Sequence, residues 1–358
     1  MTLRVALVGG PMYDHLYEWF DPDEIEVVVH ADHPTLNREV ARMLAAGERI
    51  DVLSTHSKYA PSQADWLLPL DGLIDPGELA PLAVELCRFD GALLCAPRLI
   101  DVRIAWSRRD RVDPASIGSW TSLADSTTRF GFPGRDSGLF GTFFELVVGA
   151  GGRLFDTEGN ATLTTPQAEA ALATLHRMAE RLPADLATWH YDHVDTALLN
   201  GTIDAAGVWP GGWGAISRSP LADRLQPTLY PAGPVRRVSY SGCHAWAITR
   251  TCSDPLLAAA VVQQLSGRDA QRLDTTGGSV CAHVEAFASI EPVDDLDRQR
   301  LALTATTIEH AMITYPPHPR FPELEEAGWQ LVQRSLADAD GHRQGLSELQ
   351  QLADRLFT

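Results

Sequence analysis

The chain has 358 residues, of which 45% are hydrophobic and 21% are charged, a composition typical of a soluble globular protein. This length is enough for two domains of ordinary size, each with its own core. The formal net charge of −18 argues against nucleic acid or an anionic membrane surface as a partner. No stretch approaches the ~20 consecutive apolar residues of a membrane-spanning helix. We therefore expect no nucleic-acid partner and no membrane insertion.

The beginning of the sequence, MTLRVALVGG, leads directly into an apolar run and a Gly-Gly turn. It lacks the basic start, the longer apolar run and the small-residue cleavage site of a secretory signal. The cysteines have irregular spacing and form no Cys-x-x-Cys pair of the kind that binds metals; they are Cys87, Cys95, Cys243, Cys252 and Cys281. As written, the sequence predicts a cytoplasmic protein, or an extracytoplasmic one if a leader has been removed.

Strand and helix signals alternate in the first part of the chain. Short apolar runs predict strands in RVALVGG, EIEVVVHA and IDVLST. Apolar residues at helical spacing predict a helix between Thr35 and Glu48. A strand, helix, strand order with short connections favours parallel pairing, and so an α/β lobe.

The remainder of the chain continues the mixed pattern. TTRFGFPG and GTIDAAGVWPGGWG predict strands, and GTFFELVVGAGG and TPQAEAALATLHRMAERL predict helices. HAWAITR returns to strand character, and SDPLLAAAVVQQLSG predicts a helix with proline in its first turn. After Asp294 the sequence is mostly helical and ends in GLSELQQLADRLF.

Four segments carry a family resemblance: FGFPGRDSGLFGTFFELVVGAGGRLFDTEGNATLTTPQAEAALATLHRM, ALLNGTIDAAGVWPGGWGAI, SYSGCHAWAITRTCSDPLLAAAVVQQLSGRDAQRLDTTGGSVCAH and ADWLLPLDGLI. Together they resemble the family 1 extracellular solute-binding proteins, which are the carbohydrate receptors of ABC importers. The resemblance covers nearly the whole chain, as a pattern of many weak matches rather than one diagnostic motif.

The resemblance implies a periplasmic binding protein-like fold of type II, with two hinged α/β lobes, C-terminal helices and a ligand in the interlobe cleft. We expect lobe 1 at residues 1–104 and 247–298, and lobe 2 at residues 105–246 and 299–358. The implied ligand is small and polar, either a carbohydrate or a sugar-like acid. An ABC importer permease is the implied partner if the protein is exported. We expect a monomer without a cofactor.

Most candidate ligand-binding residues lie near the ends of predicted strands, because ligands of open parallel sheets collect at the carboxyl ends of the strands. Arg103 is a candidate because it lies near the first expected crossing between the lobes and could clamp a carboxylate or phosphate. The candidates are Tyr13, Asp14, His15, His56, Lys58, Tyr59, Arg103, Ser137, Trp209, Trp213, Tyr240, Cys243 and His244. Some have a structural role as the competing explanation. Asp14 could cap a helix, Ser137 could belong to a plain turn, and one of the two tryptophans could be core.

Lys58 is the only lysine among the 29 basic residues of the chain. It follows the predicted strand IDVLST and stands beside His56 and Tyr59. A compact ammonium can be desolvated and deprotonated, which a guanidinium cannot. We therefore expect Lys58 to face the cleft and to contact an anionic or hydroxyl-rich part of the ligand.

The sequence contains no nucleophile elbow, P-loop or zinc motif. The missing export signal keeps a second hypothesis open, which is a cytoplasmic enzyme of the lyase or isomerase type on the same fold. In that case Lys58 and His56 are the catalytic candidates, with His15 and Asp14 nearby. One further pair, at 190 and 193, puts two histidines three positions apart without a companion ligand, so we predict no metal site.

Overall fold

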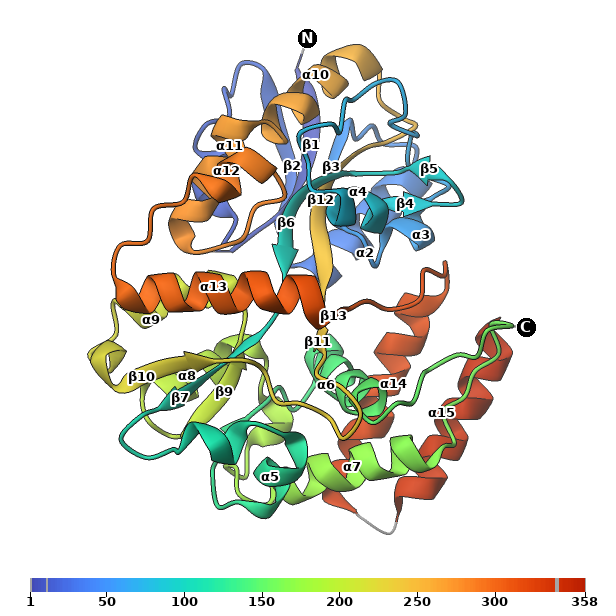
Figure 1. Cartoon of the computed structure of the whole chain (residues 1–358). Helices are drawn as coiled ribbons and strands as arrows, with labels where there is room; N and C mark the ends of the chain where they lie inside the picture. The colour runs from blue at the N-terminus through green and yellow to red at the C-terminus, as the bar shows by residue number, and fades with distance from the viewer. Residues whose placement is uncertain (1, 11, 339–340, 358) are drawn as a thin grey trace. The chain divides into compact units, whose positions relative to one another are not determined.

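The computed structural model describes residues 2–10, 12–338 and 341–357. The chain divides into two compact units, whose elements are labelled in Figure 1. Unit 1 comprises Met1–Asp101, Gly242–Glu291 and Pro317–Pro319. Unit 2 comprises Val102–Ser241, Pro292–Pro316 and Arg320–Thr358. The chain therefore passes between the units several times.

Unit 1 is built on a five-stranded sheet with the strand order β2-β1-β3-β12-β6. The strands are β1 (Leu3–Val8), β2 (Ile25–Ala31), β3 (Val52–His56), β6 (Ala96–Asp101) and β12 (Gly242–Ile248). β1 pairs in parallel with β2 and β3, which confirms the pairing predicted from the sequence. β12 runs antiparallel between β3 and β6. β12 follows the long unit 2 segment Val102–Ser241 and thus joins β6 to the rest of the sheet.

The helices of unit 1 are α1 (Asp14–Tyr17), α2 (His33–Ala45), α3 (Ala60–Gln63), α4 (Pro81–Leu86), α10 (Pro255–Leu265), α11 (Arg268–Asp274) and α12 (Val284–Ala288). α2 packs on β1 and β2, whereas α4 and α10 pack on β6 and β12. Two short strands, β4 (Arg88–Phe89) and β5 (Ala92–Leu93), form a separate antiparallel pair. Proline stands in the first turn of α10, and the Asp254 carboxylate accepts a hydrogen bond from the Leu257 N–H, as expected for an N-cap.

Unit 2 contains a four-stranded sheet with the strand order β10-β7-β9-β8. The strands are β7 (Ile104–Arg108), β8 (Phe130–Gly131), β9 (Ala205–Val208) and β10 (Leu225–Thr228). β7 pairs antiparallel with β9 and β10, and β8 pairs in parallel with β9. A separate parallel pair joins β11 (Ser239–Tyr240) to β13 (Met312–Ile313).

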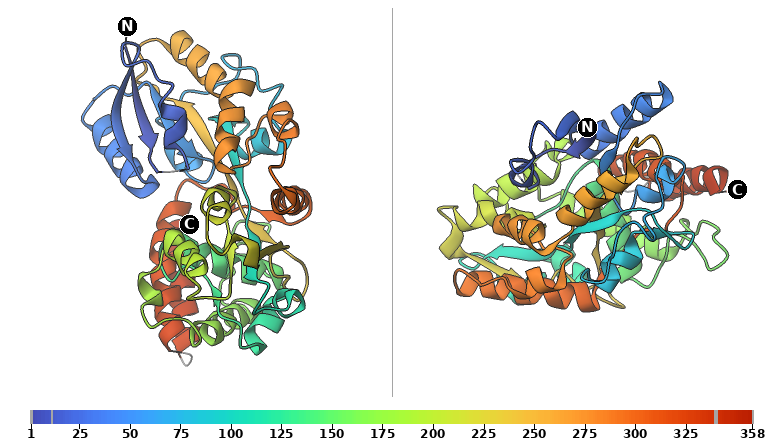
Figure 2. Two further views of the ribbon diagram at one scale, coloured as in Figure 1. Left: turned by 90° about the vertical axis from the view of Figure 1, so that its left-hand side faces the viewer. Right: turned by 90° about the horizontal axis from the view of Figure 1, so that it is seen from above.

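Helices make up most of unit 2. They are α5 (Trp120–Asp125), α6 (Asp136–Gly149), α7 (Pro166–Ala179), α8 (Tyr191–Leu199), α9 (Trp213–Ser217), α13 (Asp295–His310), α14 (Phe321–Ala337) and α15 (His342–Phe357). From its third residue on, α6 is buried on every side, which fits its almost uniformly apolar sequence. α14 packs against α6, α7 and α15, and Figure 2 shows the two C-terminal helices in red. The helical character predicted after Asp294 is confirmed.

The two longest strands that escaped the sequence analysis are both fully buried. β6 and β7 lie in the segment APRLIDVRIAWSR. Arg98, Arg103 and Arg108 interrupt its apolar pattern, yet each of these side chains is buried. A strand that contains buried arginines paired with carboxylates lacks a continuous apolar run, so it cannot be predicted from apolar runs alone.

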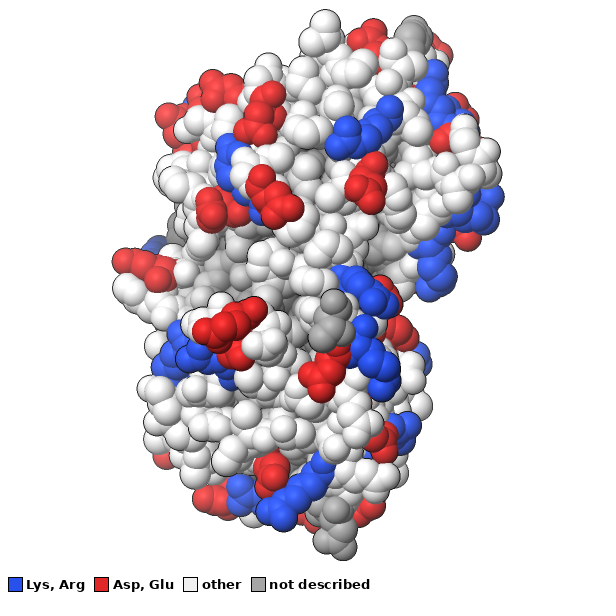
Figure 3. Space-filling model, turned by 90° about the vertical axis from the view of Figure 1, so that its right-hand side faces the viewer, with Lys and Arg blue, Asp and Glu red and all other residues white. Residues whose placement is uncertain are grey.

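The surface in Figure 3 carries acidic and basic side chains interspersed over the whole face, without a large patch of one sign. Within the described part of the chain, no helix is both long enough and apolar enough to cross a membrane.

A buried ion pair connects β6 to α11 inside unit 1. The Arg98 guanidinium donates to both carboxylate oxygens of Asp274 at 2.8 Å, and the two side chains are 1% and 0% exposed. The same guanidinium donates to the Tyr17 hydroxyl at 3.1 Å and to the Tyr13 carbonyl at 3.2 Å. Such a pair is costly to bury but more costly to break, because either partner alone leaves an uncompensated charge.

We expect Asp274→Asn to lower the free energy of unfolding by about 3–5 kcal/mol, since it leaves the Arg98 charge buried without its counter-charge. Urea unfolding followed by circular dichroism measures this loss. Glu285→Gln is the control, because Glu285 forms an exposed ion pair with Arg268 in the same unit, at 3.6 Å. A surface pair contributes about 0–1 kcal/mol. Equal losses in the two variants would contradict the structural role of the buried pair.

Candidate functional site

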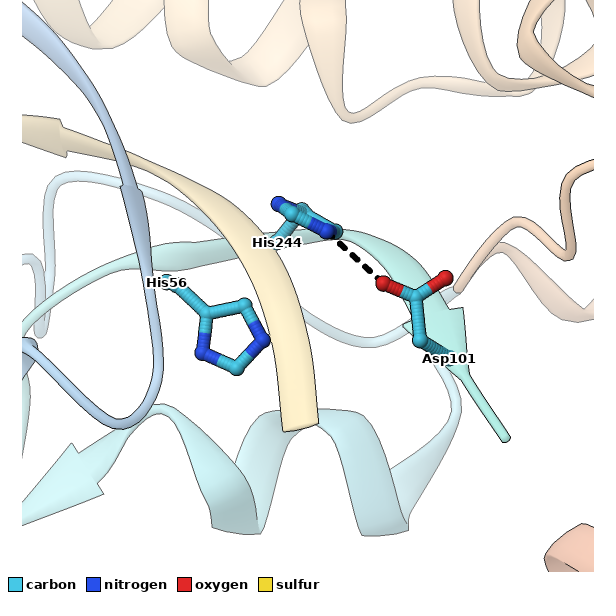
Figure 4. Close-up of side chains that lie close together, drawn as sticks. All are labelled: His56, Asp101 and His244. Carbon is cyan, nitrogen blue, oxygen red and sulfur yellow. Dashed lines mark ion pairs between the residues drawn. The ribbon is translucent and has the colours of Figure 1, made fainter. Parts of the chain in front are cut away.

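In unit 1, the strand register brings three polar side chains to one face of the sheet. On β12, His244 lies opposite His56 of β3, and Gly242 lies opposite Asp101 of β6. Paired residues of adjacent strands point to the same face, as do residues two positions apart on one strand. His56, His244 and Asp101 therefore converge, as Figure 4 shows.

These three side chains are close enough to interact directly. The Nε2 atom of His244 lies 2.7 Å from Oδ2 of Asp101. The rings of His56 and His244 stand almost perpendicular, with centroids 4.9 Å apart. All three residues are buried, and one ligand atom from each lies within 4.8 Å of the others.

Two neighbouring residues extend this group. Nε2 of His33, at the start of α2, lies 3.1 Å from Nδ1 of His244, and the two rings are stacked. The Tyr13 hydroxyl lies 3.1 Å from Nε2 of His244. We call His33, His56, His244, Asp101 and Tyr13 the histidine cluster. His244 is at its centre, because it contacts a carboxylate, a phenol and a second imidazole.

Burial disfavours the charged form of two imidazoles in the histidine cluster. Burial lowers the pKa of His33 and of His56 well below the usual range, because a charged ring loses its hydration. The nearby His244 and the Lys58 ammonium lower both pKa values further by repelling additional positive charge. A neutral imidazole carries one N–H donor and one acceptor nitrogen, so this face is suited to hydroxyl groups.

Lys58 borders the histidine cluster. Its Nζ lies 4.8 Å from the centroid of the Tyr59 ring, and that ring lies 5.8 Å from the ring of His33. The Lys58 backbone N–H donates to Nδ1 of His56 at 3.2 Å. This bond assigns the lone pair to Nδ1 and, in the neutral ring, the hydrogen to Nε2 of His56. The side chain is half-buried rather than extended into solvent.

Two other candidates, Asp14 and His15, lie outside the histidine cluster. Asp14 accepts hydrogen bonds from the Gly10 N–H and contacts Nε2 of His30 at 2.8 Å, which is a structural role. His15 contacts Asp274 at 3.1 Å.

Cys243 is buried on the other face of β12, where its thiol interacts with that of Cys87. Burial beside other thiols raises the pKa of Cys87 well above its usual value, so it is a poor nucleophile. Strand alternation thus separates Cys243 from its neighbour His244.

In unit 2, Arg103 is buried at the centre of a second group. Its guanidinium forms an ion pair with Glu145 of α6, and Glu145 also accepts a hydrogen bond from the Tyr240 N–H at 2.6 Å. The guanidinium carbon lies 5.3 Å from the ring centroid of Trp209 and 5.0 Å from that of Tyr230. The charge of Arg103 is therefore compensated inside the protein, which removes the reason to expect it to clamp an anion.

The two tryptophans of the GVWPGGWG segment have different surroundings. Trp209 is half-buried and lies edge-on to Tyr191 and Tyr240, with centroids 5.8 Å and 6.3 Å apart. Trp213 is buried and stacks on Trp106 at 6.0 Å. Trp213 is thus part of the core, which is the alternative left open for one of the two tryptophans. Trp209 is the one of the two with an accessible surface.

Ser137 and the two histidines at 190 and 193 lie at the starts of helices α6 and α8. Ser137 lies half-buried in the first turn of α6. Its neighbour Asp136 contacts Nδ1 of His190 at 2.6 Å. The two histidines form a capping box at the start of α8, in which His193 Nδ1 accepts from the His190 N–H. A helix cap accounts for their spacing.

The sequence analysis missed His33 and Asp101. His33 follows β2 in the segment HADHPTL. Its position just after a predicted strand was the feature that could have identified it as a candidate. Asp101 ends β6, a strand that was itself not predicted. Its proximity to His244 depends on the pairing of β6 with β12, which joins residues more than 140 positions apart and which periodicity alone does not reveal.

A surface cavity of about 360 Å³ lies elsewhere in unit 2, along α8. It is lined by Pro183, Asp185, Trp189, Asp192, His193, Thr196, Ala197, Asn200 and Thr202. None of the candidate ligand-binding residues lines it. Unlike the histidine cluster at the carboxyl edge of the unit 1 sheet, the residues that line this cavity do not follow the carboxyl end of a strand.

Asp195 of α8 lies close to Gly212 in the turn between Trp209 and Trp213. A Cβ atom on Gly212 would lie 3.3 Å from its Oδ2 atom. Burial, with a smaller contribution from repulsion by Asp192, raises the pKa of Asp195 to about 7. This carboxyl group titrates near neutral pH, unlike an exposed aspartate.

Comparison by sequence identifies no relative of the chain. No protein-family model matches it, and no curated protein matches it either.

Solved structures resemble the chain over its full length. The maltose-bound MalE3 of T. maritima has a TM-score of 0.87 at 20% identity, with 99% of each chain covered. A solute-binding protein of Thermotoga lettingae bound to α-D-tagatose has a TM-score of 0.85 at 16% identity, with 100% of each chain covered. One from Agrobacterium radiobacter in complex with ribitol has a TM-score of 0.83 at 17% identity, covering 100% of this chain and 99% of that one. The chain has the two-lobe periplasmic binding protein fold, which confirms the fold class predicted from the sequence.

We expect Gly242→Ala to displace the His56 ring, because a Cβ atom at Gly242 would lie 2.0 Å from Cε1 of that ring. The overpacking should cost about 1–3 kcal/mol of stability and shift the imidazole resonances of His56 in NMR spectra. Gly277→Ala is the matched control, since nothing lies within 4 Å of a Cβ atom there. Unchanged His56 resonances in the Gly242 variant would contradict the close approach.

We expect Asp195→Asn to stabilise the protein at pH 8 by roughly 1–3 kcal/mol and to have little effect at pH 4. The folded carboxyl has a pKa of about 7, well above the unfolded value of about 3.9, so the folded state binds more protons between these values. Its contribution to the free energy of unfolding therefore falls as pH rises through that range. Urea unfolding at both pH values measures it, with the exposed Asp185→Asn as control. An effect independent of pH would disprove the raised pKa.

Proposed function

We propose that the protein is a solute-binding protein for a small, uncharged, polyhydroxylated ligand, a sugar or a polyol. The observation that carries the proposal is the histidine cluster at the carboxyl edge of the unit 1 sheet, in a fold shared with proteins solved with maltose, tagatose and ribitol. In open α/β sheets, ligands bind outside the carboxyl ends of the strands.

The composition of the histidine cluster supports hydroxyl recognition. Neutral imidazoles, a carboxylate and a phenol offer both donors and acceptors within a few ångströms. Each sugar hydroxyl can donate one hydrogen bond and accept others, so a surface with both kinds of group satisfies it. The half-buried Lys58 adds three donors beside Tyr59.

Trp209 supports the same proposal from unit 2. Flat aromatic rings pack on the apolar C–H faces of sugar rings, while neighbouring polar groups bind the hydroxyls. The indole of Trp209 is held edge-on by Tyr191 and Tyr240 and lies over the Arg103 guanidinium. Its accessible part is therefore presented in a fixed orientation, which reduces the entropy lost on binding.

Charge compensation favours a neutral ligand over a sugar-like acid. Arg103 is neutralised by Glu145, and the burial of His33 and His56 keeps both imidazoles uncharged. At these three side chains, a carboxylate ligand would find no uncompensated cation.

The enzyme alternative depended on Lys58, His56, His15 and Asp14 acting together. His15 contacts Asp274 and Asp14 contacts His30, so these two carry structural contacts instead. No second function is proposed. A solute receptor of this kind would work outside the cytoplasmic membrane and would deliver its ligand to the permease of an ABC importer.

We expect at least one of maltose, ribitol, tagatose and mannitol to bind the full chain saturably in isothermal titration calorimetry. Trp209→Ala should then weaken binding by about 1–3 kcal/mol, because the ligand loses its stacking surface. Trp19→Ala is the control, since Trp19 is 56% exposed and belongs to neither group. An unchanged affinity in the Trp209 variant would remove this residue from the site, and no binding across a wider panel of sugars and polyols would refute the proposal.

A further inference from the structure

We propose that His56, His244 and Asp101 form a three-ligand site for a divalent transition-metal ion of the Zn²⁺ type. Within residues 2–10, 12–338 and 341–357, this is the one group of three histidine, cysteine or acidic residues whose ligand atoms all lie within 4.8 Å of one another. The proposal goes beyond sugar binding and does not depend on it.

The backbone already fixes most of the geometry that a metal ion needs. The three residues stand on adjacent strands, at β-sheet pairs that set their Cα positions, so little freedom is lost when an ion binds. Nitrogen ligands lie about 2.0–2.1 Å and carboxylate oxygens about 2.0–2.2 Å from Zn²⁺. Ligand atoms within 4.8 Å of one another can reach these distances by small side-chain rotations.

Gly242 makes room between the ligands. It is paired with Asp101 and precedes His244 by two residues, so a side chain there would project among the three. A Cβ atom would lie 2.0 Å from Cε1 and 2.6 Å from Nε2 of His56. The Nε2 edge of His56 therefore occupies the space above Gly242, on the side toward Asp101, and Figure 4 shows the three side chains facing one another.

The donor set indicates the class of ion. Two imidazoles and one carboxylate suit Zn²⁺ and other divalent ions of the first transition row, whereas Ca²⁺ and Mg²⁺ prefer oxygen ligands. Three protein ligands leave a coordination position open for water or for a hydroxyl group. Nδ1 of His244 meets His33, and this outer contact would orient the ring, as second-shell partners do in metal sites.

Three existing contacts oppose the ion. Nε2 of His244 would have to give up its contacts with Oδ2 of Asp101, at 2.7 Å, and with the Tyr13 hydroxyl, at 3.1 Å. Nδ1 of His56 accepts from the Lys58 N–H at 3.2 Å, which requires the ring hydrogen on Nε2. Coordination through Nε2 moves that hydrogen to Nδ1 and so removes this bond. A neutral hydrogen bond is worth about a tenfold change in an equilibrium constant, and one to a carboxylate somewhat more, which is small compared with three metal–ligand bonds.

The test is a metal titration of the full chain. Bound metal is first removed with a chelator, and the chelator is then removed from the protein. Zn²⁺ in competition with a chromophoric chelator should reveal one tight site per chain, and Co²⁺ should give visible ligand-field bands. His244→Ala and Asp101→Asn should each weaken Zn²⁺ binding by more than the roughly 10–100-fold cost of removing an outer-shell partner. Asp101→Asn keeps the shape of the side chain, so it carries the test if His244→Ala fails to fold.

The double variant His190→Ala/His193→Ala is the matched control, because it removes a neighbouring pair of histidines that caps α8. It should bind Zn²⁺ like the unaltered protein. The proposal is overturned if no site with one Zn²⁺ per chain is found, or if the His244 and Asp101 variants bind Zn²⁺ normally. It is also overturned if the His190→Ala/His193→Ala variant is the one that loses Zn²⁺ binding. These titrations contain no sugar, and sugar binding measured in excess chelator tests the proposed function separately.

Discussion

The register of β12 between β3 and β6 is the constraint on which the candidate site depends. It sets His244 opposite His56 and Gly242 opposite Asp101, so that one face of the sheet gathers two imidazoles and a carboxylate. A slip by one residue would turn Cys243 to this face and His244 to the other. The strand is buried along its whole length, and this burial fixes the register.

Buried arginines have a related role in both units. Arg98 joins β6 to α11 through Asp274, and Arg103, where the chain has entered unit 2, joins the start of β7 to α6 through Glu145. Each guanidinium also lies against aromatic rings, which offset part of its desolvation. These charges therefore fix neighbouring elements to one another.

The sequence predicted the elements whose patterns are local and missed those that depend on distant pairing. β1, β3, α2 and α10 follow from apolar runs, helical spacing and caps, and the fold class followed from the resemblance. The importance of His56 and His244 could be inferred from their places beside strands. Asp101 could not, because its strand is interrupted by Arg98 and its partner lies far along the chain. His33 stood close after a predicted strand but was not among the candidates.

The solitary lysine has a practical consequence. Apart from the α-amine, Lys58 carries the only primary amine of the chain, and this amine lies beside Tyr59 at the border of the histidine cluster. An amine-reactive dye would therefore attach at a single side chain without any engineered cysteine. Four of the five cysteines are buried, and the half-buried Cys252 follows the far end of β12, so thiol chemistry offers no comparable handle at this edge of the sheet. The natural composition of the protein thus supplies its own attachment point for an optical reporter of events at this edge of the sheet.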